Sequence, residues 1–89
     1  MEKSKFIDQL FEAVLTLESI DECYEFFSDA CTPKEIQSIA QRFAVAKMLN
    51  EKYVYNDIVE TTGASTATIS RVSRSINSGY AKVFSRLGK

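Results

Sequence analysis

Residues 57–72 read Asp-Ile-Val-Glu-Thr-Thr-Gly-Ala-Ser-Thr-Ala-Thr-Ile-Ser-Arg-Val, the pattern of two short helices joined by a turn. Ile58 and Val59 fall on the inner face of the first helix. Ile69 and Val72 fall together on the inner face of the second. Gly63 lies between the two helices and suits the left-handed backbone that ends a helix in a tight turn. The stretch therefore predicts a helix-turn-helix.

The outer face of the second helix carries small, hydroxyl-bearing and basic side chains. A recognition helix enters the major groove with its N-terminal residues at the base edges, where methyl groups contact thymine and hydroxyl groups bond to bases or phosphates. The residues that we expect to form the DNA-binding face are Ser65, which caps this helix, and Thr66, Ala67, Thr68, Ser70, Arg71 and Arg74. Two plainer interpretations stay open: residues 63–70 form only a capped turn, and Arg74 is a solvated surface charge.

Apolar residues recur at helical spacing in three segments upstream, over about residues 3–17, 20–30 and 33–50. Ser19 and Glu22 have the spacing of a capping box before the second of these helices. Thr32-Pro33-Lys34-Glu35 has the pattern of a helix start, with a capping threonine and proline in the first helical position. The apolar stripe expected on the third helix consists of Ile36, Ile39, Ala40, Phe43 and Ala46, and extends to Leu49. The predicted fold class is all-α.

We expect the 89 residues to form one domain: a helical dimerisation body over 1–52, the helix-turn-helix over 53–79, and a short C-terminal helix or tail over 80–89. A chain of this size buries little surface on its own. The first two helices carry more apolar surface than the rest of the chain can cover, including Phe6, Leu10, Phe11, Tyr24 and Phe27. A homodimer is therefore expected, with a compact monomer as the alternative.

The formal net charge of −1 is unevenly distributed along the chain. Residues 1–52 hold six Lys/Arg and ten Asp/Glu, whereas residues 53–89 hold five and two. The C-terminal part is therefore positive, which permits phosphate contact there, although an exposed and merely solvated basic helix would give the same count.

Several classes of function are disfavoured by composition. The chain has no histidine, and Cys23 and Cys31 offer too few ligands for a zinc site, so both thiols are expected to be buried and inert. Neither a phosphate-binding glycine loop nor an activated nucleophile is present, so we expect no enzyme activity, metal or cofactor. No apolar run is long enough to span a membrane, and the N-terminus has no secretory pattern, which predicts a cytoplasmic protein.

Several of these motifs resemble the Trp repressor family. The resemblance rests on Thr32-Pro33-Lys34-Glu35, Gln41-Arg42 and the segment from Gly63 to Arg71, and it spans about residues 17–80. The block over 35–42, followed by the block over 62–72, is similar to the YerC/YecD-type branch of that family. The resemblance implies an all-helical, intertwined homodimer whose two helix-turn-helix units bind a pseudo-palindromic operator.

The resemblance also implies a corepressor pocket. In the Trp repressor two arginines sandwich the indole ring, and the matching positions here are Arg42 and Arg71; Thr32 and Ser75 match two further pocket residues. Val72 replaces the glycine against which the indole lies, so its side chain would fill part of the pocket. We therefore do not expect L-tryptophan to act as effector, while another effector, or none, stays open. Arg42 then pairs with a carboxylate or contacts a phosphate.

The function expected from these features is sequence-specific binding of duplex DNA as a transcriptional regulator. Repression is the expected mode, because a small dimer without an activation module acts most simply by occupying promoter DNA. The alternative is a helical protein–protein interaction module, in which the helix-turn-helix is only a packing unit. Salt-dependent DNA binding separates the two, since phosphate contacts release counterions.

Overall fold

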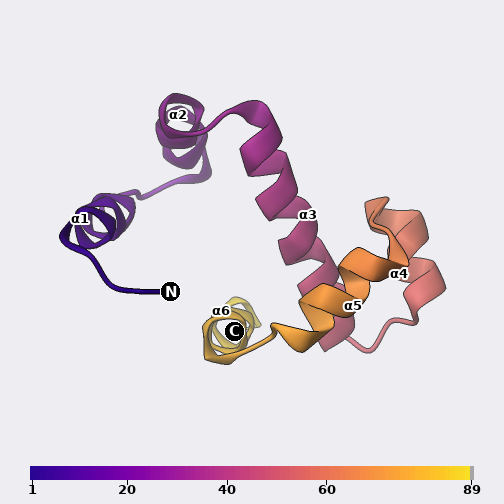
Figure 1. Cartoon of the computed structure of the whole chain (residues 1–89). Helices are drawn as coiled ribbons and strands as arrows, with labels where there is room; N and C mark the ends of the chain where they lie inside the picture. The colour runs from indigo at the N-terminus through magenta and orange to yellow at the C-terminus, as the bar shows by residue number, and fades with distance from the viewer. Residues whose placement is uncertain (89) are drawn as a thin grey trace. The chain divides into compact units, whose positions relative to one another are not determined.

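The computed structural model describes residues 1–88, and these residues form six α-helices and no strand (Figure 1). The helices are α1 (Lys5–Val14), α2 (Ile20–Ala30), α3 (Pro33–Asn50), α4 (Tyr55–Thr62), α5 (Thr66–Arg74) and α6 (Ser78–Leu87). The predicted all-α class is confirmed. The chain divides into two compact units, Met1–Pro33 and Lys34–Lys89, which we describe separately.

Serine side chains define the starts of both helices in the first unit. The backbone N–H of Ile7 donates to Ser4 Oγ at 3.1 Å, and that of Glu22 donates to Ser19 Oγ at the same distance. The carboxylate of Glu22 accepts from the backbone N–H of Glu18 at 2.9 Å. The serine half of the predicted capping box is therefore confirmed, whereas the carboxylate accepts from the residue before the cap and not from Ser19 itself. α1 begins later than expected because Ser4 caps it, and it ends at Val14, after which Thr16 and Leu17 make the tighter bonds of a turn.

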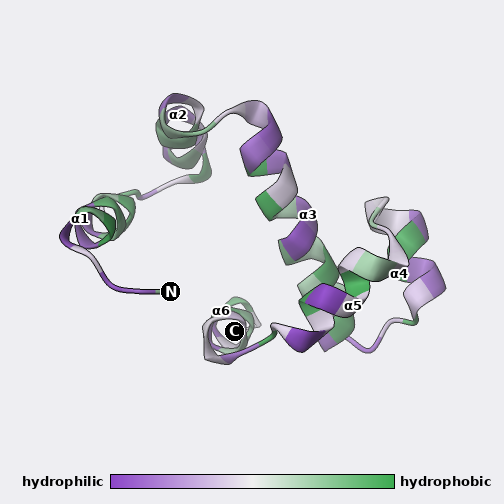
Figure 2. Cartoon of the chain, in the orientation of Figure 1, coloured by the Kyte–Doolittle hydropathy of each residue, from purple (hydrophilic) through white to green (hydrophobic). Residues whose placement is uncertain are grey.

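Neither α1 nor α2 buries a residue within the chain. Both helices have a hydrophobic and a hydrophilic side (Figure 2), and the hydrophobic sides stay open: Phe6 is 83% exposed and Tyr24 is 72% exposed. The expectation of two buried thiols is wrong for the chain by itself, because Cys23 is exposed and Cys31 is half-buried. Cys23 neighbours Tyr24 on this uncovered side of α2.

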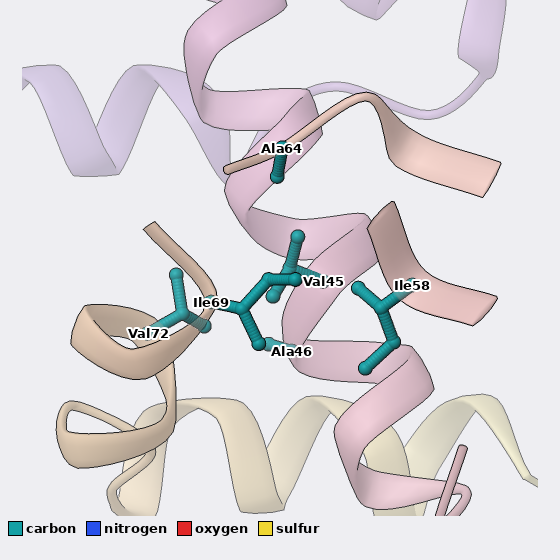
Figure 3. Packing of buried hydrophobic residues seen from close by; sticks show 6 residues of the cluster. All are labelled: Val45, Ala46, Ile58, Ala64, Ile69 and Val72. Carbon is teal, nitrogen blue, oxygen red and sulfur yellow. The ribbon is translucent and has the colours of Figure 1, made fainter. Parts of the chain in front are cut away.

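The hydrophobic core lies in the second unit and joins α3, α4 and α5. Figure 3 shows its side chains pointing toward one another from the three helices and from the turn before α5. The buried residues are Val45, Ala46, Ile58, Ala64, Ile69 and Val72, all at most 5% exposed. The inward positions predicted for the helix-turn-helix are therefore confirmed. The core fixes α4 and α5 against the C-terminal half of α3.

The predicted stripe on α3 holds at Phe43, Ala46 and Leu49, which pack within the chain, and fails further toward the N-terminus of the helix. Ala46 is buried as expected, but its buried neighbour is Val45, whereas Ile39 is 47% exposed and Ala40 is exposed. The stripe prediction is therefore wrong for Ile39 and Ala40 within the chain. The reason is that Val45 points to the side of α3 on which α4 and α5 pack, and nothing in the described residues covers Ile39. From Lys34 onward, α3 belongs to the same compact unit as the helix-turn-helix.

Three aromatic rings attach α6 to α3. Phe43 on α3 contacts Phe84 at a centroid distance of 5.6 Å and Tyr80 at 6.1 Å, and the two α6 rings stack on each other at 5.7 Å. These contacts account for a helix in the segment that the sequence left as a short helix or tail. Residue 89 of that segment lies outside the described residues.

α3 ends in a hydrogen-bonded turn that leads directly into the helix-turn-helix. The N–H of Tyr53 donates to Met48 O and that of Lys52 donates to Leu49 O, each at 3.1 Å. This pair of bonds is a Schellman motif, which needs a left-handed residue at its centre. Lys52 occupies that position with φ 69°, where glycine is the usual residue.

Candidate nucleic-acid interface

The turn between α4 and α5 has the backbone geometry that the sequence predicts. Gly63 adopts a left-handed conformation with φ 73°, and its N–H donates to Val59 O at 2.9 Å. Thr62 closes the turn from its other side: its hydroxyl donates to Ile58 O at 2.7 Å and accepts from the N–H of Ala64 at 3.1 Å. The backbone N–H groups of Gly63 and Ala64 are thus both bonded within the turn.

Ser65 caps α5, as predicted. Its Oγ accepts from the N–H of Thr68 at 3.1 Å and also lies 3.1 Å from Thr68 Oγ1. Thr68 is half-buried and takes part in the cap, so its hydroxyl is less available than the sequence suggested. Thr66 and Ala67 are both exposed at the start of the helix. The N-terminal turn of α5 therefore offers small side chains that would allow close approach of a ligand.

A stripe on α5 faces directly away from the core. Its members have i, i+3, i+4 and i+7 spacing, opposite the buried Ile69 and Val72. We call these residues the outer stripe: Ala67, Ser70, Arg71 and Arg74. Ala67 and both arginines are exposed, whereas Ser70 is half-buried. Of the sequence-predicted DNA-binding residues, the structure thus leaves Thr66, Ala67, Arg71 and Arg74 fully open on one helix.

The charge on this helix is entirely positive. α5 carries Arg71 and Arg74 and no carboxylate. The compact units differ in the same sense, since residues 1–33 hold two Lys/Arg and eight Asp/Glu, whereas residues 34–89 hold nine and four. Cations near a helix C-terminus also stabilise the helix dipole, which is a second reason for basic residues there. The outer stripe is nevertheless suited to an anionic ligand.

Two of the residues that match the corepressor pocket have structural roles within the chain, one in the core and one in a local hydrogen bond. Val72 is 5% exposed and belongs to the core. The hydroxyl of Ser75 donates toward the carbonyls of Arg71, at 2.7 Å, and Val72, at 3.3 Å, so it terminates α5. Thr32 lies in the first compact unit and the other matching residues lie in the second.

Arg42 is exposed, and its Nε donates to the carbonyl of Ser38 in the preceding turn of α3 at 3.4 Å. On the same helix, Lys47 and Glu51 form a salt bridge at 3.5 Å. The side chain of Arg42 thus bonds to the backbone of its own helix and is otherwise open to solvent.

Gln41, next to Arg42, was not singled out as a site residue by the sequence, yet it is the side chain of α3 that reaches the turn. Its Nε2 donates to the carbonyl of Thr62 at 3.1 Å. The signal that could have found it is its spacing of four residues from Val45, which places a polar group at the end of the buried seam. Within residues 1–88 no group of three His, Cys, Asp or Glu side chains could hold a metal, and no helix is long and apolar enough to cross a membrane.

Comparison with known proteins identifies relatives over nearly the whole chain. Residues 5–87 match the Trp repressor protein family. YerC of Bacillus subtilis is 56% identical over 77 residues, which cover 86% of this chain and 74% of YerC.

Two crystal structures share the fold. A TrpR-like protein from Eubacterium eligens has a TM-score of 0.93 and 58% identity, with 97% of this chain and 92% of that chain covered. A candidate Trp repressor from Staphylococcus aureus has a TM-score of 0.91 and 49% identity, with coverages of 97% and 89%. The chain belongs to the Trp repressor family, whose members are regulators and not enzymes.

Proposed function

We propose that this protein is a DNA-binding transcriptional regulator that contacts duplex DNA through the outer stripe of α5. One observation carries the proposal: α5 is capped at Ser65, buried along Ile69 and Val72, and exposed along a carboxylate-free stripe on the opposite side. A helix held in this way in a helix-turn-helix can enter the major groove as a rigid unit.

The chemistry of α5 changes along its length in the order that groove binding requires. Thr66 and Ala67, in the first turn, would meet base edges, where their methyl groups can contact thymine and the threonine hydroxyl can bond to a base or a phosphate. Arg71 and Arg74, in the last turn, would neutralise phosphates. The remaining residues of the proposed DNA-binding face are Ser65, Thr68 and Ser70. Ser65 and Thr68 contribute mainly by capping the helix.

A homodimer is the assembly that we propose. The uncovered apolar sides of α1 and α2 need a partner surface, and the exposed large side chains there are Phe6, Leu10, Phe11, Leu15, Ile20 and Tyr24. A second copy offers a surface of the same composition through two-fold symmetry. Two helix-turn-helix units related in this way would bind a pseudo-palindromic operator, and occupancy of that operator would repress transcription.

The alternative is a protein–protein interaction module, and the same uncovered sides of α1 and α2 favour it. In that case a different protein covers Phe6 and Tyr24, and the outer stripe of α5 stays solvated. The two functions differ in salt response, because neutralised phosphates release counterions and apolar protein contacts do not.

Selection from random duplexes tests the proposal. The purified chain is incubated with a random pool, and bound DNA is amplified and sequenced. We expect enrichment of a symmetric site whose half-sites are separated by one helical turn of DNA, about 34–36 Å, or a multiple of it. Failure to enrich any sequence over several rounds at low salt would favour the interaction module.

A further inference from the structure

Gln41 connects α3 to the turn of the helix-turn-helix. It lies one helical turn before Val45 on the same face of α3, so the seam against α4 and α5 begins with a polar side chain and continues with buried apolar ones. Its amide nitrogen donates to the carbonyl oxygen of Thr62 at 3.1 Å, across 21 residues of sequence and in a partly buried position.

The acceptor of this bond is the carbonyl of the last residue of α4. Carbonyls at a helix end have no partner within their own helix. Two backbone N–H groups of this turn make short-range bonds, from Gly63 to the Val59 carbonyl and from Ala64 to the Thr62 hydroxyl. Gln41 therefore supplies a bond that ties the turn to α3, whereas the remaining bonds only shape the turn internally.

This bond complements the apolar contact between α3 and α5. Val45 and Ala46 pack with Ile69 and Val72, and apolar packing is not directional, so it permits small rotations of α5 about the contact. A hydrogen bond at the other end of the seam is directional and removes that freedom. Recognition by a helix in the major groove depends on such orientation, because base contacts need defined donor and acceptor positions.

We propose that Gln41 is a positioning residue. Its side-chain amide links the turn of the helix-turn-helix to α3 by a hydrogen bond, and this bond holds α5 in the orientation that binds DNA. The proposal rests on the DNA-binding function proposed above. Gln41 acts through the turn, to which its side-chain amide donates a hydrogen bond. Loss of the Gln41 hydrogen bond should therefore weaken binding to every DNA sequence by a similar factor, without reducing the sequence preference at any one base pair.

The first test uses the unmodified chain and needs no DNA. The side-chain amide protons of Gln41 should exchange with solvent more slowly than those of Gln37, an exposed glutamine one turn earlier on the same helix. One net hydrogen bond corresponds to a factor of about five in an equilibrium. Equal exchange rates for the two side chains would show that the Gln41 amide is not held by the hydrogen bond to Thr62, whatever the protein binds.

The second test substitutes the donor. Gln41→Met keeps the length and helix propensity of the side chain and removes its N–H, while Gln41→Glu keeps the shape and replaces the donor by an acceptor that faces Thr62 O. Gln37→Met and Gln37→Glu are the matched controls. Exchange of the Gly63 and Ala64 backbone amides should rise about fivefold in Gln41→Met and further in Gln41→Glu. Exchange at Val45 should stay unchanged, which shows that the core is intact.

DNA binding provides the functional measurement. On a duplex enriched by the unmodified chain, Gln41→Met should lose affinity about fivefold, with the salt slope unchanged because no phosphate contact is lost. A reduced slope, or relaxed preference at one base pair, would overturn the positioning role and make Gln41 a DNA contact. Unchanged affinity in both Gln41 variants would also overturn it. If the unmodified chain binds no duplex, the proposed DNA-binding function is wrong, and Gln41 has no role in it. The exchange data then still decide whether the Gln41 hydrogen bond stabilises the turn.

Discussion

Substitutions of Val72 test two roles of this residue. One is to stabilise the core by packing, and the other is to prevent L-tryptophan from binding at the corepressor position. Val72 is 5% exposed in the core between α3 and α5. Val72→Ala removes two buried methyl groups, each contributing about 0.8 kcal/mol, and with a small cavity term the loss of unfolding free energy should be about 2 kcal/mol. Val72→Gly should cost about 1 kcal/mol more, because glycine is a poor helix former.

Urea denaturation at fixed protein concentration measures the loss of unfolding free energy in both variants. Titration calorimetry with L-tryptophan tests whether Val72 prevents binding at the corepressor position. We expect no binding of L-tryptophan to the unmodified chain, since a valine at the position of the matching glycine would fill part of the volume that the indole needs. Val72→Gly reopens that volume and is the variant in which weak binding would appear. The reasoning is refuted if Val72→Ala loses less than about 0.5 kcal/mol, or if the unmodified chain binds L-tryptophan at micromolar concentration.

Three further predictions concern capping, backbone strain and assembly. Ser65→Ala should lower the unfolding free energy by about 1 kcal/mol in urea denaturation, because the N–H of Thr68 loses its acceptor; no loss would contradict the cap. Lys52→Gly should raise it by about 1 kcal/mol, because the left-handed conformation costs lysine more than glycine; a decrease would argue against strain at this turn. Phe6→Asp should give a monomer in light scattering with helix content retained, because Phe6 is 83% exposed within the chain; an unchanged mass would place the dimer contact elsewhere.

The helix-turn-helix was predictable because its determinants are local. Gly63, the cap at Ser65 and the inward pair Ile69 and Val72 depend on spacings of a few residues, and each lies where the periodicity placed it. The outward positions of Arg71 and Arg74 follow from the same periodicity.

The packing of α3 was less predictable because this helix has apolar residues on more than one side. Periodicity correctly selected Ala46, but it also selected Ile39, which is exposed, and it missed Val45, which is buried. The Gln41 bond and the ring contacts of Phe43 with α6 depend on which distant segments meet, and helical spacing holds no information about that. The exposure of Cys23 has the same origin, since its burial would require a surface that the chain itself does not supply.

Salt dependence of DNA binding is the measurement that tests the role of the outer stripe most directly. Binding of an enriched duplex is followed by fluorescence anisotropy between low and physiological salt, for the unmodified chain, Arg71→Ala and Arg74→Ala, with Lys3→Ala as a control for the loss of an exposed cation outside α5. We expect each arginine that contacts a phosphate to lower the affinity, and to reduce the slope of log affinity against log salt by about one per subunit on substitution, with no change for Lys3→Ala. If both arginine variants are folded and bind with the affinity and slope of the unmodified chain, α5 does not contact DNA through this stripe.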